Sequence, residues 1–255
     1  MSYRIIGHRG NKAKFIENTL AGFQSILQNP DIDGFELDVV MSKDKKLLIS
    51  HDRFITDPSG KKHYIHNLTY NELLTLGKIS HIAEKQKGIR YPLLEDVLKL
   101  YANQPHKKMI LLEIKSIPSS GTLPLSISQF VKSIHNLLEA FDIHETCTII
   151  SFDYRIIKES YKLSTKQKVG LILHHNLIPI VSIAETLHIS MLVMAKDWIT
   201  QEQVTEMRKC NIDIFTWTPN TEKEWLRLST LGVKGLITDK PEALSIFSKD
   251  IRNEI

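Results

Sequence analysis

Cysteine is scarce in this chain, and long apolar runs are missing. The only cysteines among the 255 residues are Cys147 and Cys210, too few for a disulfide framework, which favours a reducing compartment. No apolar run approaches the ~20 residues that a membrane-spanning helix needs. Residues 1–10 also lack the apolar segment of a signal peptide. We therefore expect a cytoplasmic protein that does not insert stably into a membrane.

The chain also has little excess of either charge. Its 33 Lys and Arg stand against 29 Asp and Glu, a formal net charge of +4. Because the lysines are scattered, nucleic acid is a poorer partner for this mild positive charge than a small anionic substrate. A hydrophobic content of 42% excludes a disordered chain and indicates a globular protein.

Short β-type runs alternate with helical patterns along the whole sequence. We expect strands at Arg4–Gly7, Gly34–Val40, Met109–Ile114, Thr146–Ser151, Val169–Leu173, Met191–Met194, Ile212–Trp217 and Gly235–Thr238. A further run, Leu47–Ser50, follows Val40 too closely for a parallel crossover, so it predicts an antiparallel hairpin about a turn at Ser42–Lys46. Eight parallel strands with helices between them, in about 250 residues, predict an α/β fold of the (β/α)₈ TIM-barrel type.

Helix-capping patterns support this alternation. Thr19 precedes an apolar helical face, and three Thr-x-x-Glu/Gln boxes begin at Thr69, Thr200 and Thr221. The 39 residues between His51 and Tyr91 interrupt the alternation with a turn at 57–60 and one short helix. Such a long excursion is typical of an insertion or lid. We therefore expect a single domain over 1–255 with an insertion at about 52–91.

The first group of interest is Gly7-His8-Arg9-Gly10, directly after the first strand. This position is the carboxyl end of a barrel strand, where barrel enzymes place their catalytic groups. The guanidinium of Arg9 suits a phosphate or a carboxylate. Taken alone, the pair also fits a buried structural histidine and a surface arginine.

Acidic residues follow on two further strands. Strand alternation places Glu36 and Asp38 on one face, and Glu113 shares a face with Lys115. Solvated acids, or a structural ion pair of Glu113 with Lys115 or Arg9, would also explain these residues. Three converging carboxylates would instead form an all-oxygen site, which suits Mg²⁺ or Ca²⁺ better than Zn²⁺.

A second histidine, His51, ends the hairpin. With the turn centred near residues 43–44, antiparallel pairing places His51 opposite Glu36, at the same end of the barrel as His8. Two imidazoles beside a metal site and two cationic side chains would suit acid–base chemistry on a phosphate ester.

The order of these residues resembles the glycerophosphodiester phosphodiesterases, a family of phospholipase-C-like barrels. The resemblance runs from residue 4 to about 242 and is carried by His8-Arg9-Gly10, Glu17-Asn18-Thr19, Glu36-x-Asp38, His51-Asp52, Glu113-x-Lys115, Ser151-Phe152, Trp217-Thr218 and Gly235-Leu236-Ile237-Thr238-Asp239. It implies that Glu36, Asp38 and Glu113 hold a divalent metal ion, Mg²⁺ or Ca²⁺. It also implies that His8 and His51 are the acid–base pair, that Arg9 and Lys115 bind the phosphate, and that Trp217 forms a wall of the pocket.

The activity that this resemblance implies is metal-dependent hydrolysis of glycerophosphodiesters to sn-glycerol 3-phosphate and an alcohol. One alternative is lysophospholipase D or phospholipase-C-like action on lipids, which the lack of a basic amphipathic helix with a broad apolar face disfavours. Another is a non-catalytic phosphodiester-binding barrel, although all three carboxylates and both histidines are present.

Overall fold

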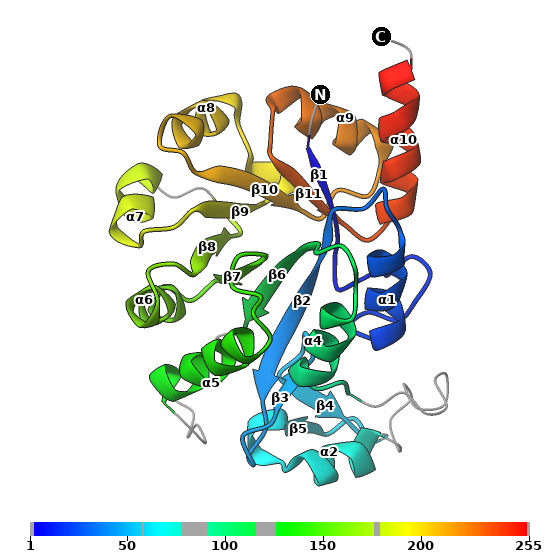
Figure 1. The fold of residues 1–255 in the computed structure, drawn as a ribbon, viewed down its shortest axis with the longest axis vertical. Helices are drawn as coiled ribbons and strands as arrows, with labels where there is room; N and C mark the ends of the chain where they lie inside the picture. Colours follow the sequence, from blue (N-terminus) through cyan, green and yellow to red (C-terminus); the bar gives the residue numbers. More distant parts are fainter. Residues whose placement is uncertain (1–2, 58, 78–90, 116–125, 176–178, 254–255) are drawn as a thin grey trace.

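A closed ring of eight parallel strands forms the centre of the molecule (Figure 1). The computed structural model describes residues 3–57, 59–77, 91–115, 126–175 and 179–253. In ring order the strands are β1 (Arg4–Gly7), β2 (Gly34–Met41), β6 (Met109–Ile114), β7 (Cys147–Ser151), β8 (Lys168–Leu173), β9 (Met191–Ala195), β10 (Asp213–Trp217) and β11 (Gly235–Thr238). The ring closes because β1 pairs in parallel with both β2 and β11. The predicted TIM barrel is confirmed, and the expected strand bounds are correct to within one residue.

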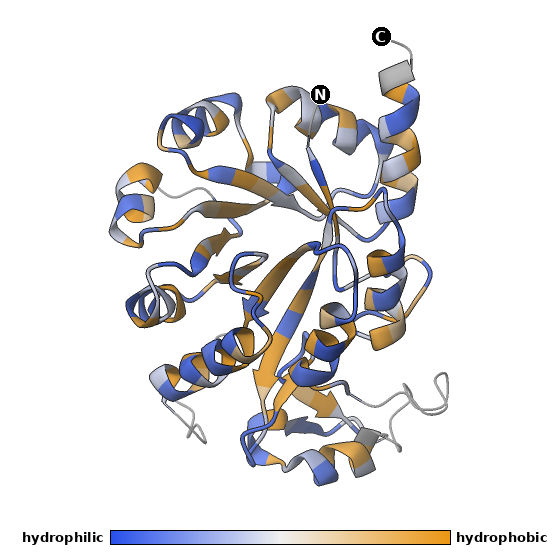
Figure 2. Cartoon of the chain, viewed as in Figure 1, coloured by the Kyte–Doolittle hydropathy of each residue, from blue (hydrophilic) through white to orange (hydrophobic). Residues whose placement is uncertain are grey.

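Helices surround this ring and turn their apolar faces toward the strands (Figures 1 and 2). They are α1 (Leu20–Gln28), α4 (Leu94–Ala102), α5 (Ile127–Ala140), α6 (Tyr154–Leu163), α7 (Ile180–Thr186), α8 (Gln201–Lys209), α9 (Glu222–Leu231) and α10 (Pro241–Asn253). Local sequence fixes several starts: Thr19 caps α1, and the predicted boxes at Thr200 and Thr221 cap α8 and α9. No helix in the described ranges combines the length and the apolar composition needed to cross a membrane.

Strand alternation separates an outer core from the interior of the barrel. On β2, Phe35, Leu37 and Val39 are fully buried in the core between strands and helices. Each such side chain contributes roughly 1.5–3 kcal/mol by leaving water. The same alternation directs Glu36 and Asp38 to the inside of the barrel, so burying the apolar face of β2 also orients its two carboxylates.

Apolar side chains fill the barrel interior beneath these acids. They come from seven of the eight strands and include Ile6, Leu111, Ile150, Ile172, Val193, Phe215 and Ile237. The barrel is therefore a packed core, as is usual for this fold, and its polar interior groups lie at the carboxyl ends of the strands.

A small lobe extends β2 beyond the ring, at the bottom of Figure 1. It contains β3 (Leu47–Ile49), β4 (Phe54–Thr56), β5 (Lys62–Tyr64), the 3₁₀ helix η1 (Ile65–Asn67) and α2 (Tyr70–Gly77). A separate cluster of Val40, Leu48, Ile55, Ile65 and Leu73 holds it together. The sequence predicted the β3 hairpin arm, the turn at residues 57–60 and α2. It missed the antiparallel pairing of β4 with β5, because a three-residue strand is too short for its alternation to be recognised. Residues 78–90 of the expected insertion lie outside the described residues.

The register of the β2–β3 hairpin differs by one residue from the expectation. Val39 pairs with Ile49, so an extended ladder would place His51 opposite Leu37, and the prediction that His51 faces Glu36 is wrong. The ladder also ends at Ile49 and the chain bends at residues 51–53. The turn residue Lys45 adopts a left-handed conformation, φ 66°, and a turn of this kind sets the register.

One prediction concerns Gly34, where β2 meets β6. A Cβ at Gly34 would lie 2.1 Å from the carbonyl oxygen of Met109 on β6. Gly34→Ala should therefore lower the free energy of unfolding by about 1–3 kcal/mol, because overpacked backbone must move. Urea denaturation measures this change.

Gly60→Ala provides the control. Gly60 has φ +85°, and no atom of the described residues lies within 4 Å of an added Cβ. This variant therefore carries only the left-handed backbone cost of about 1 kcal/mol. A Gly34→Ala variant as stable as the wild-type protein would contradict the steric argument.

Candidate active site

Seven of the eight residues predicted from the sequence line one cavity at the carboxyl ends of the strands. The cavity has a volume of about 130 Å³, and these residues are His8, Arg9, Glu36, His51, Glu113, Lys115 and Trp217. The eighth, Asp38, lies beside them and is 1% exposed. Residues from five separate parts of the chain therefore meet at one mouth of the barrel.

A tight turn after β1 positions His8 and Arg9. The Gly10 N–H donates to the Gly7 carbonyl at 3.3 Å, and Gly10 has φ +88°, a conformation that glycine adopts without strain. A Cβ at Gly7 would lie 2.5 Å from the Gly10 carbonyl oxygen. Both glycines are therefore required for the chain to turn back at this point.

A hydrogen bond at Nδ1 orients the imidazole of His8. Its Nδ1 lies 2.7 Å from Oδ1 of Asp239, which follows β11. Asn220 donates from Nδ2 to the other Asp239 oxygen at 2.9 Å. Although burial alone would raise the pKa of Asp239, its bond to His8 lowers that pKa. Asp239 is thus the ionised acceptor of an Nδ1–H bond, which leaves Nε2 of His8 for proton exchange.

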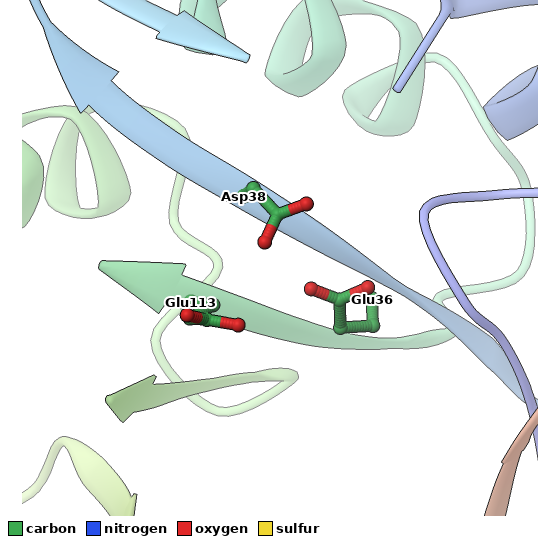
Figure 3. A group of neighbouring side chains, drawn as sticks. All are labelled: Glu36, Asp38 and Glu113. Carbon is green, nitrogen blue, oxygen red and sulfur yellow. The ribbon is translucent and has the colours of Figure 1, made fainter. Parts of the chain in front are cut away.

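The three carboxylates point toward one another from two neighbouring strands (Figure 3). The parallel pairing of β2 with β6 sets Asp38 beside Glu113, and Glu36 lies one inward position earlier on β2. One oxygen from each residue lies within 4.8 Å of the others, and all three side chains are buried. The register of two strands, rather than a loop, thus fixes the cluster.

Two cationic side chains contact this acidic cluster. Lys115 Nζ lies 2.6 Å from Glu113 and 2.7 Å from Asp38, so one of the ion pairs considered from the sequence is present. Arg9 pairs with Glu17 at 2.9 Å and approaches Asp38 at 3.4 Å. Two positive charges therefore face three carboxylates and only partly balance them.

This imbalance appears in the pKa values of the carboxyl groups. Burial, followed by repulsion from Asp38 and Glu113, raises the pKa of Glu36 well above its ordinary value. Burial raises the pKa of Glu113 to about 7 against the opposing charge of Lys115. Burial would also raise the pKa of Asp38, but Lys115 and Arg9 lower it overall. Without a further cation, the cluster thus holds protons that ordinary carboxylates would have lost at neutral pH.

The donor set fits a hard divalent cation. It consists of carboxylate oxygens that are close together and short of positive charge, which is the environment that Mg²⁺ and Ca²⁺ prefer. Burial of the three side chains and their register on two strands would give such an ion a rigid set of ligands.

His51 borders the same cavity from the lobe side. Its Nδ1 lies 3.0 Å from Oδ1 of the adjacent Asp52, and its side chain is 39% exposed. Burial, followed by the positive charge of Lys115, lowers the pKa of His51. The imidazole is therefore neutral at pH 7 and able to accept a proton.

Some residues of the site were assigned no role from the sequence, although they belong to two of the motifs that carry the family resemblance. Asn18 donates from Nδ2 to Asp38 at 2.8 Å and holds that carboxylate. Its neighbour Glu17 holds Arg9, and Phe152 lines the cavity. The triplet Glu17-Asn18-Thr19 and the pair Ser151-Phe152 were signals of these positions, but their contacts depend on the fold.

Comparisons with known proteins agree with this geometry. Residues 8–243 match the model of the Glycerophosphoryl diester phosphodiesterase family. A protein of Caldanaerobacter subterraneus named glycerophosphodiester phosphodiesterase is 28% identical over 250 residues, covering 96% of this chain and 97% of that one. A Bacillus altitudinis protein of the same name is 30% identical over 256 residues, covering 94% and 95%. The structure of an Oleispira antarctica phosphodiesterase in complex with the product sn-glycerol-3-phosphate has a TM-score of 0.82 at 20% identity, covering 96% of each chain.

The charge balance leads to a prediction for Glu113→Gln. In metal-free protein the pKa of Glu113 is raised, so its contribution to stability falls as the pH rises through about 7. A neutral glutamine avoids that loss, and at pH 8 the metal-free variant should unfold at or above the wild-type temperature. With excess Mg²⁺ or Ca²⁺ the order should reverse, since an ion at 100 times its dissociation constant adds about 2.7 kcal/mol to the wild type.

Thermal unfolding with EDTA and with each ion measures both effects, and Glu185→Gln, on the exposed side of α7, is the matched control. A purely structural ion pair of Glu113 with Lys115 predicts the opposite: destabilisation without metal and no response to either ion.

Proposed function

The chain belongs to the glycerophosphoryl diester phosphodiesterase family and is an enzyme of that family, and from this premise we propose that it hydrolyses glycerophosphodiesters to sn-glycerol 3-phosphate and a free alcohol. The observation that carries the proposal is the meeting of two imidazoles, three carboxylates and two cationic side chains at one cavity. The sn-glycerol-3-phosphate in the Oleispira antarctica structure supports the same product.

In this proposal Arg9 and Lys115 bind the phosphate. Both already lie at the cavity, and Arg9 is oriented by its ion pair with Glu17. A guanidinium offers paired N–H donors to phosphate oxygens, whereas an ammonium acts as a point charge. Glu36, Asp38 and Glu113 would hold the divalent ion, which when bound supplies Lewis-acid polarisation of the phosphate.

The two histidines move the protons. In the first step the glycerol 2-hydroxyl oxygen bonds to phosphorus, and one imidazole takes the hydroxyl proton. The bond from phosphorus to the alcohol oxygen breaks, and the other imidazole gives that oxygen a proton. In the second step water opens the cyclic phosphate and the imidazoles exchange roles, so both return to their starting protonation states. Asp239 orients the imidazole of His8, as Asp52 does that of His51.

The described part of the insertion belongs to the lobe that follows His51. It packs onto the extension of β2 through Val40 and Leu48, and it carries the chain directly after His51. We propose that residues 1–255 act as one domain with an insertion at about 52–91, and that the enzyme works on a soluble small substrate in the cytoplasm.

The first test is a substrate assay with control of the metal. Wild-type protein should release sn-glycerol 3-phosphate from glycerophosphocholine with Mg²⁺ or Ca²⁺, lose this activity in EDTA, and recover it when the ion is restored. An enzyme-coupled assay for glycerol 3-phosphate measures the product. Faster cleavage of lysophosphatidylcholine would favour the lipid alternative, and no product from several head groups with either ion would favour a non-catalytic barrel.

The second test removes each imidazole. His8→Ala and His51→Ala should each lower kcat by roughly 10²–10⁴-fold, which is the usual effect of losing a general acid or base. His106→Ala removes an exposed histidine away from the cavity and should retain wild-type kcat. If either site variant kept more than a tenth of the wild-type rate, the proposed proton transfer would be wrong.

A further inference from the structure

A row of aromatic rings leads from the cavity onto the rim of the barrel. Phe152 follows β7, His174 and His175 follow β8, and Trp198 lies in the 3₁₀ helix η2 (Lys196–Trp198) after β9. Trp217, at the end of β10, lies between Phe152 and His174 in this row and lines the cavity together with Phe152. Four consecutive strands of the ring therefore place rings at one side of the mouth, and the hydrolysis proposed above gives most of them no role.

The rings meet edge to face. Phe152 stands at 89° to Trp217 with ring centroids 5.9 Å apart, and His174 stands at 74° to Trp217 at 5.7 Å. His174 contacts His175 at 4.5 Å, and His175 meets Trp198 at 4.9 Å and 81°. Two rings thus stand roughly perpendicular to Trp217, and the row continues from His174 to His175 and Trp198.

Exposure distinguishes this row from the core. Phe152 is 46% exposed and Trp198 42% exposed, and both histidines are exposed. The aliphatic side chains that line the cavity, among them Ile150 and Ile172, are at most 3% exposed and belong to the barrel interior. The site thus has an aliphatic floor and an aromatic rim whose rings are accessible to a ligand.

The charges near the rim favour a cation. The faces of aromatic rings are electron-rich and attract ammonium groups, most strongly quaternary ones held by several rings. Lys196, next to this row, is paired with Glu224, so its positive charge is largely balanced. Asp197, between Lys196 and Trp198, is exposed and adds negative charge.

We propose that the rings of Phe152, Trp217, His174, His175 and Trp198 form a subsite for a quaternary ammonium group on the alcohol part of the substrate. This inference rests on the proposed hydrolysis and specifies its substrate: a glycerophosphodiester whose leaving alcohol carries a trimethylammonium group, as choline does. The phosphate lies at Arg9 and Lys115, and the alcohol extends from there across Trp217 to the rim.

Two substrates that differ only in charge test this subsite. The first is sn-glycero-3-phosphocholine, and the second is the corresponding 3,3-dimethylbutyl ester, in which a carbon atom replaces the quaternary nitrogen. The wild-type kcat/KM should be about fivefold or more higher for the choline ester, as expected for a cation bound by several rings. Tetramethylammonium should inhibit competitively, and tert-butanol at the same concentration should not.

Two variants test whether these rings cause the preference for the choline ester. His174→Leu and Trp198→Leu keep apolar bulk but remove the π faces, so the ratio of the two kcat/KM values should fall toward one. Tyr154→Leu removes a 58% exposed ring that belongs to neither the row nor the cavity lining, and should keep the wild-type ratio.

The outcomes separate this inference from the function on which it rests. Equal kcat/KM values in the wild type, or a preference for the dimethylbutyl ester, would overturn the cation subsite and leave the hydrolysis intact. An unchanged ratio in both leucine variants would overturn the assignment to these rings. Failure to cleave either ester, with Mg²⁺ or Ca²⁺ present, would overturn the proposed function itself.

Discussion

Mutual repulsion among three buried carboxylates is the constraint around which this end of the barrel is built. Glu36, Asp38 and Glu113 bring oxygens within 4.8 Å of one another in a place with little water, where an uncompensated charge is costly. Lys115 and Arg9 form ion pairs with this cluster, and the side-chain amide of Asn18 donates a hydrogen bond to it. Even so, two of the three acids have raised pKa values. A cluster that is still short of positive charge suits a divalent cation better than it serves stability.

The barrel makes this arrangement rigid because the acids stand on strands. Their positions follow from the parallel register of β2 with β6, and the outer faces of both strands are fixed by apolar packing against the helices. The interior below is filled by aliphatic and aromatic side chains, so the polar groups are confined to the mouth. The loops then supply what the strands cannot: His8 and Arg9 from a glycine turn, and His51 from the bend after β3.

The site is graded from its centre to its rim. Aliphatic side chains form the floor of the cavity, charged groups lie beside the carboxylates above it, and exposed rings continue outward over the ends of β7 to β10. In the proposed reaction the charged groups bind the phosphate and the rings bind the alcohol part of the substrate. His51 borders the cavity from the side of the lobe, which has its own small core.

The sequence by itself determined the barrel and most of the site, because period-two alternation and strand order are local or topological properties. Alternation alone placed Glu36 and Asp38 on one face of their strand, and Glu113 and Lys115 on one face of theirs. The carboxyl ends of parallel strands share one edge of the barrel. Only the tertiary structure decided the β2–β3 register, in which a left-handed Lys45 sets the pairing and a bend brings His51 to the cavity. The tertiary structure also decided three contacts between residues far apart in the chain. These are the bond of Asp239 to His8, the hydrogen bond of Asn18 to Asp38, and the row of aromatic rings. Such contacts depend on how packed elements are oriented in space, and that orientation cannot be predicted from local sequence patterns.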